Sequence, residues 1–161
     1  MSRCLLTVGE DDVFNTVLYV FKHDRAYDIR TILDQQGARE ISTVCRAGEK
    51  EPLGRINWRE KAFMVHGIEV PWRCLKRKES TLSLGRPNRR WGTKEYSVTG
   101  DGKKTVDAID VKDESVAGTY TPPQRHLFRK NEPARIETAY AAYDEQTIFL
   151  ILVILHNLSK Q

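Results

Sequence analysis

The sequence predicts a mainly β fold, an antiparallel β-barrel, closed or nearly closed, of about 10–12 strands that encloses a hydrophobic C-terminal α-helix. Two observations lead to this prediction. Short runs with period-two alternation fill most of residues 1–140 and are separated by turn residues. The C-terminal segment differs, because residues 148–155 are all apolar and need burial on every side of a helix.

The predicted strands are rich in β-branched and aromatic residues, and they lie at the roughly 8–12-residue spacing that is typical of sandwiches and barrels. No helical period competes with this pattern in residues 1–100. Pro122 and Pro123 follow one run directly and are expected to end an edge strand there. The runs are 6–8, 16–21, 26–32, 39–46, 52–58, 62–66, 68–72, 93–98, 104–109, 115–120, 124–128 and 133–140.

The C-terminal helix is predicted near 144–159. Asp144 occupies an N-cap position, and Glu145 places a negative charge in the first turn, where the helix dipole favours it. A segment of this length without turn signals is too long for an ordinary strand. Enclosing the apolar run contributes on the order of 12–20 kcal/mol gross. We therefore expect the barrel not to survive removal of the helix.

The chain of 161 residues fits one domain, 1–161, with a core that needs neither disulfides nor metal. No secretory signal is expected, because acids follow the first short apolar stretch at once. The three cysteines, Cys4, Cys45 and Cys74, show no disulfide or zinc spacing and are expected to be buried free thiols in strands. These observations predict a cytoplasmic location, and the eight-residue apolar run is too short to span a bilayer.

Positive charge is concentrated in one stretch, 73–90, which contains a polar loop near 76–88. Seven cations there face Glu79 alone, a net of +6, so the rest of the chain carries −2. Such a patch can bind anionic lipid head groups, phosphate ligands or nucleic acid. The alternative is a solvated loop that has no partner. Trp72 and Trp91 flank it and offer rings for stacking. The candidate ligand-binding residues are Arg73, Lys76, Arg77, Lys78, Arg86, Arg89 and Arg90.

Catalytic motifs are weak in this sequence. A hydrolase or ribonuclease would need His126 to meet acids such as Glu137, or His66 to meet Glu69, and nothing in the spacing requires either. His156 is expected to cap the helix exit. The sequence contains no metal motif, no glycine-rich phosphate loop and no serine elbow, so no catalytic residue, metal or cofactor is predicted.

The order of several short motifs resembles a family of small, uncharacterised fungal domains. More distantly, it resembles the tubby-like superfamily, which includes tubby C-terminal domains, LURP-one-related proteins and phospholipid scramblases. The resemblance implies a β-barrel threaded by a hydrophobic C-terminal helix, and tubby domains bind phosphoinositide head groups through basic side chains. It carries no individual lipid-binding residue over to this chain. The motifs are LLTV at 5–8, DD at 11–12, NTVL at 15–18, YDIRT at 27–31, GRINW at 54–58, RRW at 89–91, VAGTY at 116–120 and PARI at 133–136.

The function predicted first is a non-enzymatic binding module, peripheral to membranes, that meets an anionic ligand or phospholipid head group through the basic loop. One alternative is a small hydrolase or ribonuclease-like enzyme that uses His126. Another alternative is a protein-interaction domain whose basic loop meets an acidic partner. Nucleic acid is a less favoured partner than lipid or phosphate.

Overall fold

The computed structural model describes residues 3–21, 23–77, 88–100 and 105–160. In these ranges the chain forms thirteen strands and two helices, so the predicted mainly β fold with a C-terminal helix is confirmed. The elements are β1 Cys4–Val8, β2 Thr16–Val20, β3 Asp24–Leu33, β4 Arg39–Arg46, β5 Pro52–Asn57, β6 Ala62–Val65, β7 Ile68–Pro71, α1 Trp72–Leu75, β8 Lys76–Arg77, β9 Asn88–Trp91, β10 Lys94–Gly100, β11 Val106–Asp110, β12 Val116–Thr121, β13 Arg135–Thr138 and α2 Glu145–Leu158.

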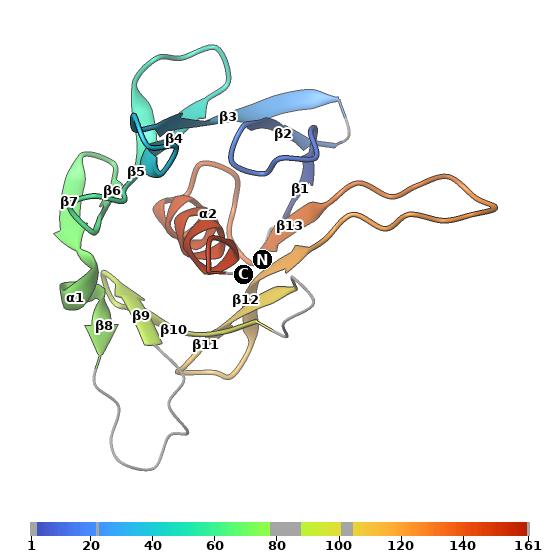
Figure 1. Ribbon diagram of the computed structural model, residues 1–161. Coiled ribbons are helices and arrows are strands. Elements are labelled where there is room, and N and C mark those ends of the chain that lie inside the picture. Colours follow the sequence, from blue (N-terminus) through green and yellow to red (C-terminus); the bar gives the residue numbers. More distant parts are fainter. Residues whose placement is uncertain (1–2, 22, 78–87, 101–104, 161) are drawn as a thin grey trace.

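All strands belong to one antiparallel sheet that curls around α2 (Figure 1). Neighbours in the sheet are mostly neighbours in the sequence, in the order β7-β6-β5-β4-β3-β2-β1-β13-β12-β11-β10-β9-β8. The pairing of β1 with β13 joins the two halves, with Leu6 opposite Ile136. The two edge strands of the sheet are therefore β7 and β8, which are separated in sequence only by α1.

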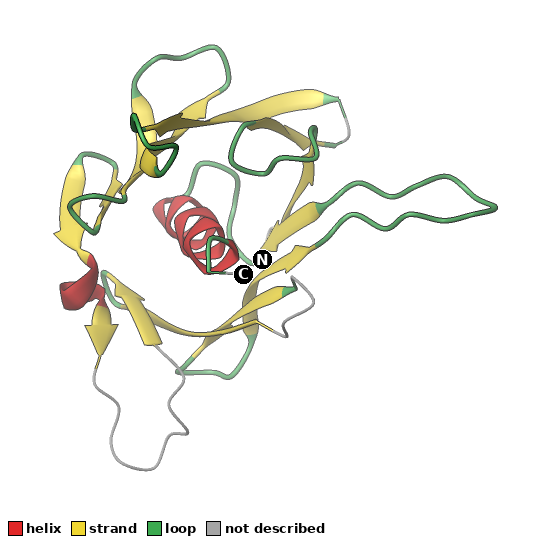
Figure 2. Cartoon of the chain, viewed as in Figure 1, coloured by secondary structure: helices red, strands yellow, loops and turns green. Residues whose placement is uncertain are grey.

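The sheet is not closed into a barrel, so the closed form of the predicted closed or nearly closed barrel was wrong. Within the described ranges, β7 pairs only with β6, and β8 pairs only with β9. The strand predicted at 68–72 ends at Pro71, which has no backbone N–H to donate to a ladder. The one-turn helix α1 then occupies the gap between the two edges, as the secondary-structure colours in Figure 2 show.

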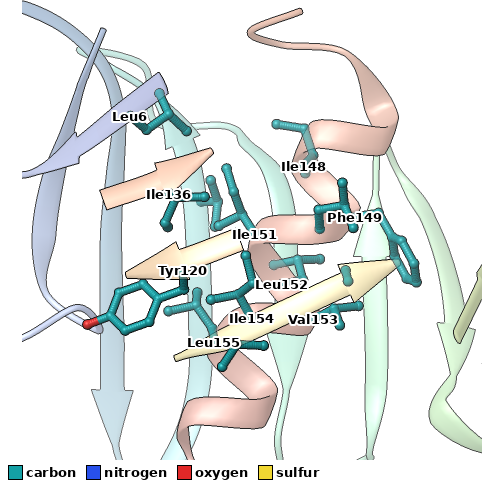
Figure 3. Close-up of a cluster of buried hydrophobic side chains, with 14 of the residues drawn as sticks. Leu6, Tyr120, Ile136, Ile148, Phe149, Ile151, Leu152, Val153, Ile154 and Leu155 are labelled. Atoms are coloured by element: carbon teal, nitrogen blue, oxygen red, sulfur yellow. The ribbon is translucent and has the colours of Figure 1, made fainter. Parts of the chain in front are cut away.

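Helix α2 lies inside the curled sheet and forms the centre of the core (Figure 3). Its apolar residues 148–155 are at most 2% exposed, as the all-round apolar pattern predicts. Asp144 is the N-cap, and its carboxylate accepts a hydrogen bond of 2.8 Å from the Gln146 N–H. The surrounding strands alternate, with every second side chain turned toward the helix, as in β11 and β10. Neither helix of the described chain is long and apolar enough to cross a bilayer.

Three local predictions differ from the structure. Pro122 and Pro123 follow β12, which pairs on both sides and is not an edge strand. Residues 124–128 form no strand, and the chain between β12 and β13 is an arm held by the single bridge of Gln124 with Glu132. The cysteines also differ from expectation, since only Cys4 is buried, Cys45 is half-buried and Cys74 is exposed in α1 rather than in a strand.

Candidate functional site

The described ends of the basic stretch meet at one edge of the sheet. Lys76 lies opposite Arg89 in the antiparallel pair of β8 with β9, and Arg77 lies opposite Asn88. Arg73 is exposed in α1, directly before β8. Lys78 and Arg86, also predicted as ligand-binding residues, lie outside the described residues. The predicted loop near 76–88 therefore begins and ends in paired strands, β8 and β9.

Alternation in β9 separates the two neighbouring arginines onto opposite faces of the sheet. Arg89 lies opposite Tyr96 and shares its face with Trp91, and both aromatic rings lie against Phe149 of α2. Arg89 is therefore turned inward. Arg90 is exposed on the outer face, where its Nε donates a hydrogen bond of 3.0 Å to the Gly92 carbonyl. One ligand on the outer surface cannot engage both side chains in the same way.

Arg89 is the most unusual charge of this site, because its side chain is only 5% exposed. Its Nη1 donates a long hydrogen bond of 3.5 Å to the Asn88 carbonyl. No carboxylate of the described chain lies within ion-pair distance of its guanidinium. Burial lowers the pKa of Arg89, since desolvation disfavours the charged form. Arg89 therefore lies in a strand, just after the polar loop predicted near 76–88, with its side chain buried.

The outer face beside Arg90 also carries an acid. Glu95 lies opposite Arg90 in the pair of β9 with β10, and its Oε1 accepts a hydrogen bond of 2.9 Å from the Asn88 amide. The Asn88 Oδ1 is buried and has no hydrogen-bond partner among the described residues. The exposed positive charge at this edge is therefore smaller than the number of cations in the sequence suggests. Arg89 does not add to it, because its side chain is buried on the inner face.

The tryptophans that flank the basic stretch are core residues and not a stacking platform. Trp91 is 6% exposed and stacks on Phe149 with ring centroids 5.4 Å apart. Trp72 is half-buried and packs on His156 at 4.3 Å. His156 is 6% exposed among aromatic rings, so the prediction that it caps the helix exit was wrong. Ser159 is the C-cap instead.

The histidines of the hydrolase alternative do not meet Glu137 or Glu69. The Nε2 of His126 lies 3.5 Å from Glu132, while Glu137 is exposed in β13. His66 lies in the turn between β6 and β7, and Glu69 instead forms an ion pair of 2.9 Å with Arg55. Among the described residues there is no group of three potential ligands that could hold a metal ion.

A buried polar cluster beside β9 was missed by sequence reasoning. The Tyr96 hydroxyl lies 2.9 Å from the Tyr140 hydroxyl and donates to Gln146 Oε1 at 2.8 Å. The Gln146 amide in turn donates to the Trp91 carbonyl at 3.2 Å. Burial raises the pKa of Tyr96 far above its ordinary value, so the phenol stays neutral. These hydrogen bonds hold the first turn of α2 against β9 and β10, and so fix the position of the strand that carries Arg89.

Two shallow depressions lie elsewhere on the sheet. One, of about 350 Å³, is lined by residues of β2 and β3 that include Arg25, Asp28 and Arg30. The other, of about 590 Å³, lies at the turn between β3 and β4 and includes Asp34, Glu40 and Arg59 in its lining. Neither is lined by a residue of the basic stretch, so they do not belong to the predicted ligand site.

Comparisons with known proteins leave the family of this chain open. No family model and no curated protein matches the sequence. Among solved structures, the chain is similar to the X-ray structure of a protein from Arabidopsis thaliana. The two are 10% identical, with a TM-score of 0.41, over 99% of this chain and 92% of that one.

Proposed function

We propose that this chain is a non-enzymatic binding module for a phosphate-bearing anionic ligand, such as a phospholipid head group, at the edge formed by β8 and β9. The observation that carries the proposal is the burial of Arg89 without an acidic partner in the described chain. A desolvated cation is costly unless an anion pairs with it, and unpaired buried charges mark functional sites. A phosphate group matches the fork of a guanidinium.

The neighbouring cations have a different role in this proposal. Arg73 and Arg90 are exposed. Exposed charges contribute little to a single contact but raise the local concentration of an anion. We infer that they attract the ligand, while Arg89 supplies the contact that holds it. The motif order that resembles the tubby-like superfamily supports the same ligand class, because tubby domains bind phosphoinositide head groups through basic side chains.

Calorimetric titration with inositol trisphosphate, a soluble head group, tests the proposal. We expect binding that weakens as ionic strength rises from about 0.1 M to 1 M. Arg89→Met should lower the affinity at least about tenfold, because it removes the buried charge and keeps most of the side-chain volume. Arg73→Ala/Arg90→Ala should weaken binding by a smaller factor that vanishes at high salt.

A matched control removes two other cations. Lys50→Ala/Arg59→Ala changes the net charge by the same amount, and both residues are exposed and lie outside the basic stretch. This variant should bind as the wild type does. Equal loss in both double variants would show that net charge alone attracts the ligand, and no binding by the wild type would overturn the proposal.

A further inference from the structure

Residues 122–134, between β12 and β13, form an arm that is separate from the proposed site at β8 and β9. It projects away from the curled sheet as a narrow hairpin (orange in Figure 1). Gln124 and Glu132 exchange two backbone hydrogen bonds of 2.9 and 2.8 Å across it. Nearer the tip, the His126 N–H donates to the Asn131 side chain at 2.8 Å. The arm therefore has defined internal bonds and presents its tip far from the core.

The tip carries the two most exposed large hydrophobic side chains of the described chain. Leu127 is 93% exposed and Phe128 is 100% exposed. Arg129 and Lys130 follow the pair directly, and Arg125 lies two residues before it, with its guanidinium 3.9 Å from the exposed Asp11 carboxylate. All three cations are exposed. Adjacent apolar residues at the end of a projecting hairpin, with exposed cations before and after them in the sequence, form a surface that water does not favour.

A lipid bilayer fits this surface better than a protein does. A stable protein interface needs about 800 Å² from each partner, which a two-residue tip does not supply by itself. The interfacial region of a bilayer accepts apolar side chains to a depth of about 5–10 Å, and Lys and Arg beside them meet anionic head groups. A narrow arm reaches that depth without bringing the polar sheet into the membrane.

Charge distinguishes this tip from a second exposed apolar pair in the described part of the chain. Ile32 and Leu33, at the end of β3, are 57% and 56% exposed. Asp34 follows them directly, and its carboxylate accepts the backbone N–H groups of the turn. That turn therefore presents an acid where the arm presents cations, and an anionic membrane would repel it.

We propose that the arm docks this protein on an anionic phospholipid bilayer by inserting Leu127 and Phe128 among the lipids, with Arg125, Arg129 and Lys130 against the head groups. This inference rests on the proposed function, because it names a membrane as the anionic surface, but it uses different residues. Binding of a soluble head group at β8 and β9 does not require the arm, and insertion of the arm into a bilayer does not require Arg89.

Vesicle sedimentation tests the arm directly. We expect the wild type to bind phosphatidylcholine vesicles that contain about 30% phosphatidylserine, and to bind pure phosphatidylcholine much less. Leu127→Ser/Phe128→Ser should lower the partition coefficient at least about tenfold. The matched control, Ile32→Ser/Leu33→Ser, also removes two adjacent exposed apolar residues and should bind as the wild type does. Both variants change exposed positions, so their thermal unfolding should match that of the wild type.

Insertion itself has a spectroscopic signature. With anionic vesicles, Phe128→Trp should show blue-shifted tryptophan fluorescence in addition to the emission of the wild type. Lipids brominated along the acyl chains should quench this added fluorescence. Unchanged vesicle binding in Leu127→Ser/Phe128→Ser, or added emission in Phe128→Trp that these lipids do not quench, would overturn the insertion. Sedimentation velocity adds a further outcome, since a wild-type dimer that this double variant abolishes, without vesicle binding, would show that the tip meets a second copy instead.

The two proposals fail separately. If vesicle binding survives in the arm variant and inositol trisphosphate binds to the wild type, the arm proposal falls and the head-group site stands. If inositol trisphosphate does not bind, but vesicle binding is lost in the arm variant and kept in its control, the head-group site falls and the arm stands.

Discussion

Gly54 of β5 lies directly against Ile148 in the first turns of α2. A Cβ at residue 54 would lie 2.6 Å from the Ile148 Cγ2, closer than real Cβ contacts allow. The absence of a side chain at this point lets the sheet approach the helix that it encloses. Packing at this contact therefore depends on both residues together.

Gly54→Ala should lower the free energy of unfolding by about 1–3 kcal/mol, because the added methyl forces the helix or the strand to shift. Chemical denaturation with circular dichroism measures the change. Gly118→Ala is the matched control, since its Cβ would lie 3.4 Å from a terminal methyl of Leu150, an ordinary contact. We expect that variant to be neutral or slightly stabilising. Equal destabilisation by both would contradict the argument.

Asp144→Ala should cost about 1 kcal/mol of stability, because it removes the carboxylate that accepts the Gln146 N–H at the start of α2. Asp144→Asn keeps an acceptor at the same position and should retain most of the stability. Denaturant unfolding of the two variants gives the comparison. A loss in Asp144→Asn as large as that in Asp144→Ala would show that the negative charge, rather than the cap, stabilises the helix.

Arg89→Met should leave the stability unchanged or raise it by about 1–2 kcal/mol, although the proposed function expects it to weaken head-group binding. A buried guanidinium that has no acidic partner in the described chain is penalised by desolvation, and the shorter, flexible methionine side chain fills most of the same space without that penalty. Thermal unfolding without ligand measures the effect. A decrease of several kcal/mol would mean that Arg89 is a structural residue, and the basis of the proposed site would be lost.

Alkaline pH should destabilise this fold beginning near pH 10. Burial raises the pKa of Tyr27 and of Tyr96 above their ordinary value, so the folded chain keeps both phenolic protons where the unfolded chain releases them. Because the unfolded state then binds fewer protons, the free energy of unfolding falls as pH rises through about 10. Below that pH the contribution of both phenols is fully present.

The double variant Tyr27→Phe/Tyr96→Phe checks this assignment. It loses the hydrogen bond from the Tyr143 N–H to the Tyr27 hydroxyl and the polar cluster of Tyr96, so it should be less stable at neutral pH. Its stability should nevertheless fall less steeply between about pH 9 and 11 than that of the wild type. An unchanged slope in denaturant titrations at these pH values would assign the alkaline loss to other groups.

The arm shows why part of the surface could not be predicted from sequence. Residues 124–128 contain apolar and polar side chains in an order that suits a short strand, and the sequence pattern predicts one there. In the structure this segment has only one bridge to its own return and no neighbouring strand, so its apolar residues stay exposed. A strand needs a partner, and partners are decided by the rest of the sheet.

The amino-acid sequence alone determined that strands alternate through most of the chain and that α2 is enclosed, since a helix that is apolar on all sides has no stable alternative in water. Only the tertiary structure decided that the sheet stays open at Pro71 and α1, and that Arg89 and Arg90 lie on opposite faces. The physical reason is that strand pairing and register are set by distant segments. The burial of Arg89 depends on its place opposite Tyr96, which local sequence does not specify.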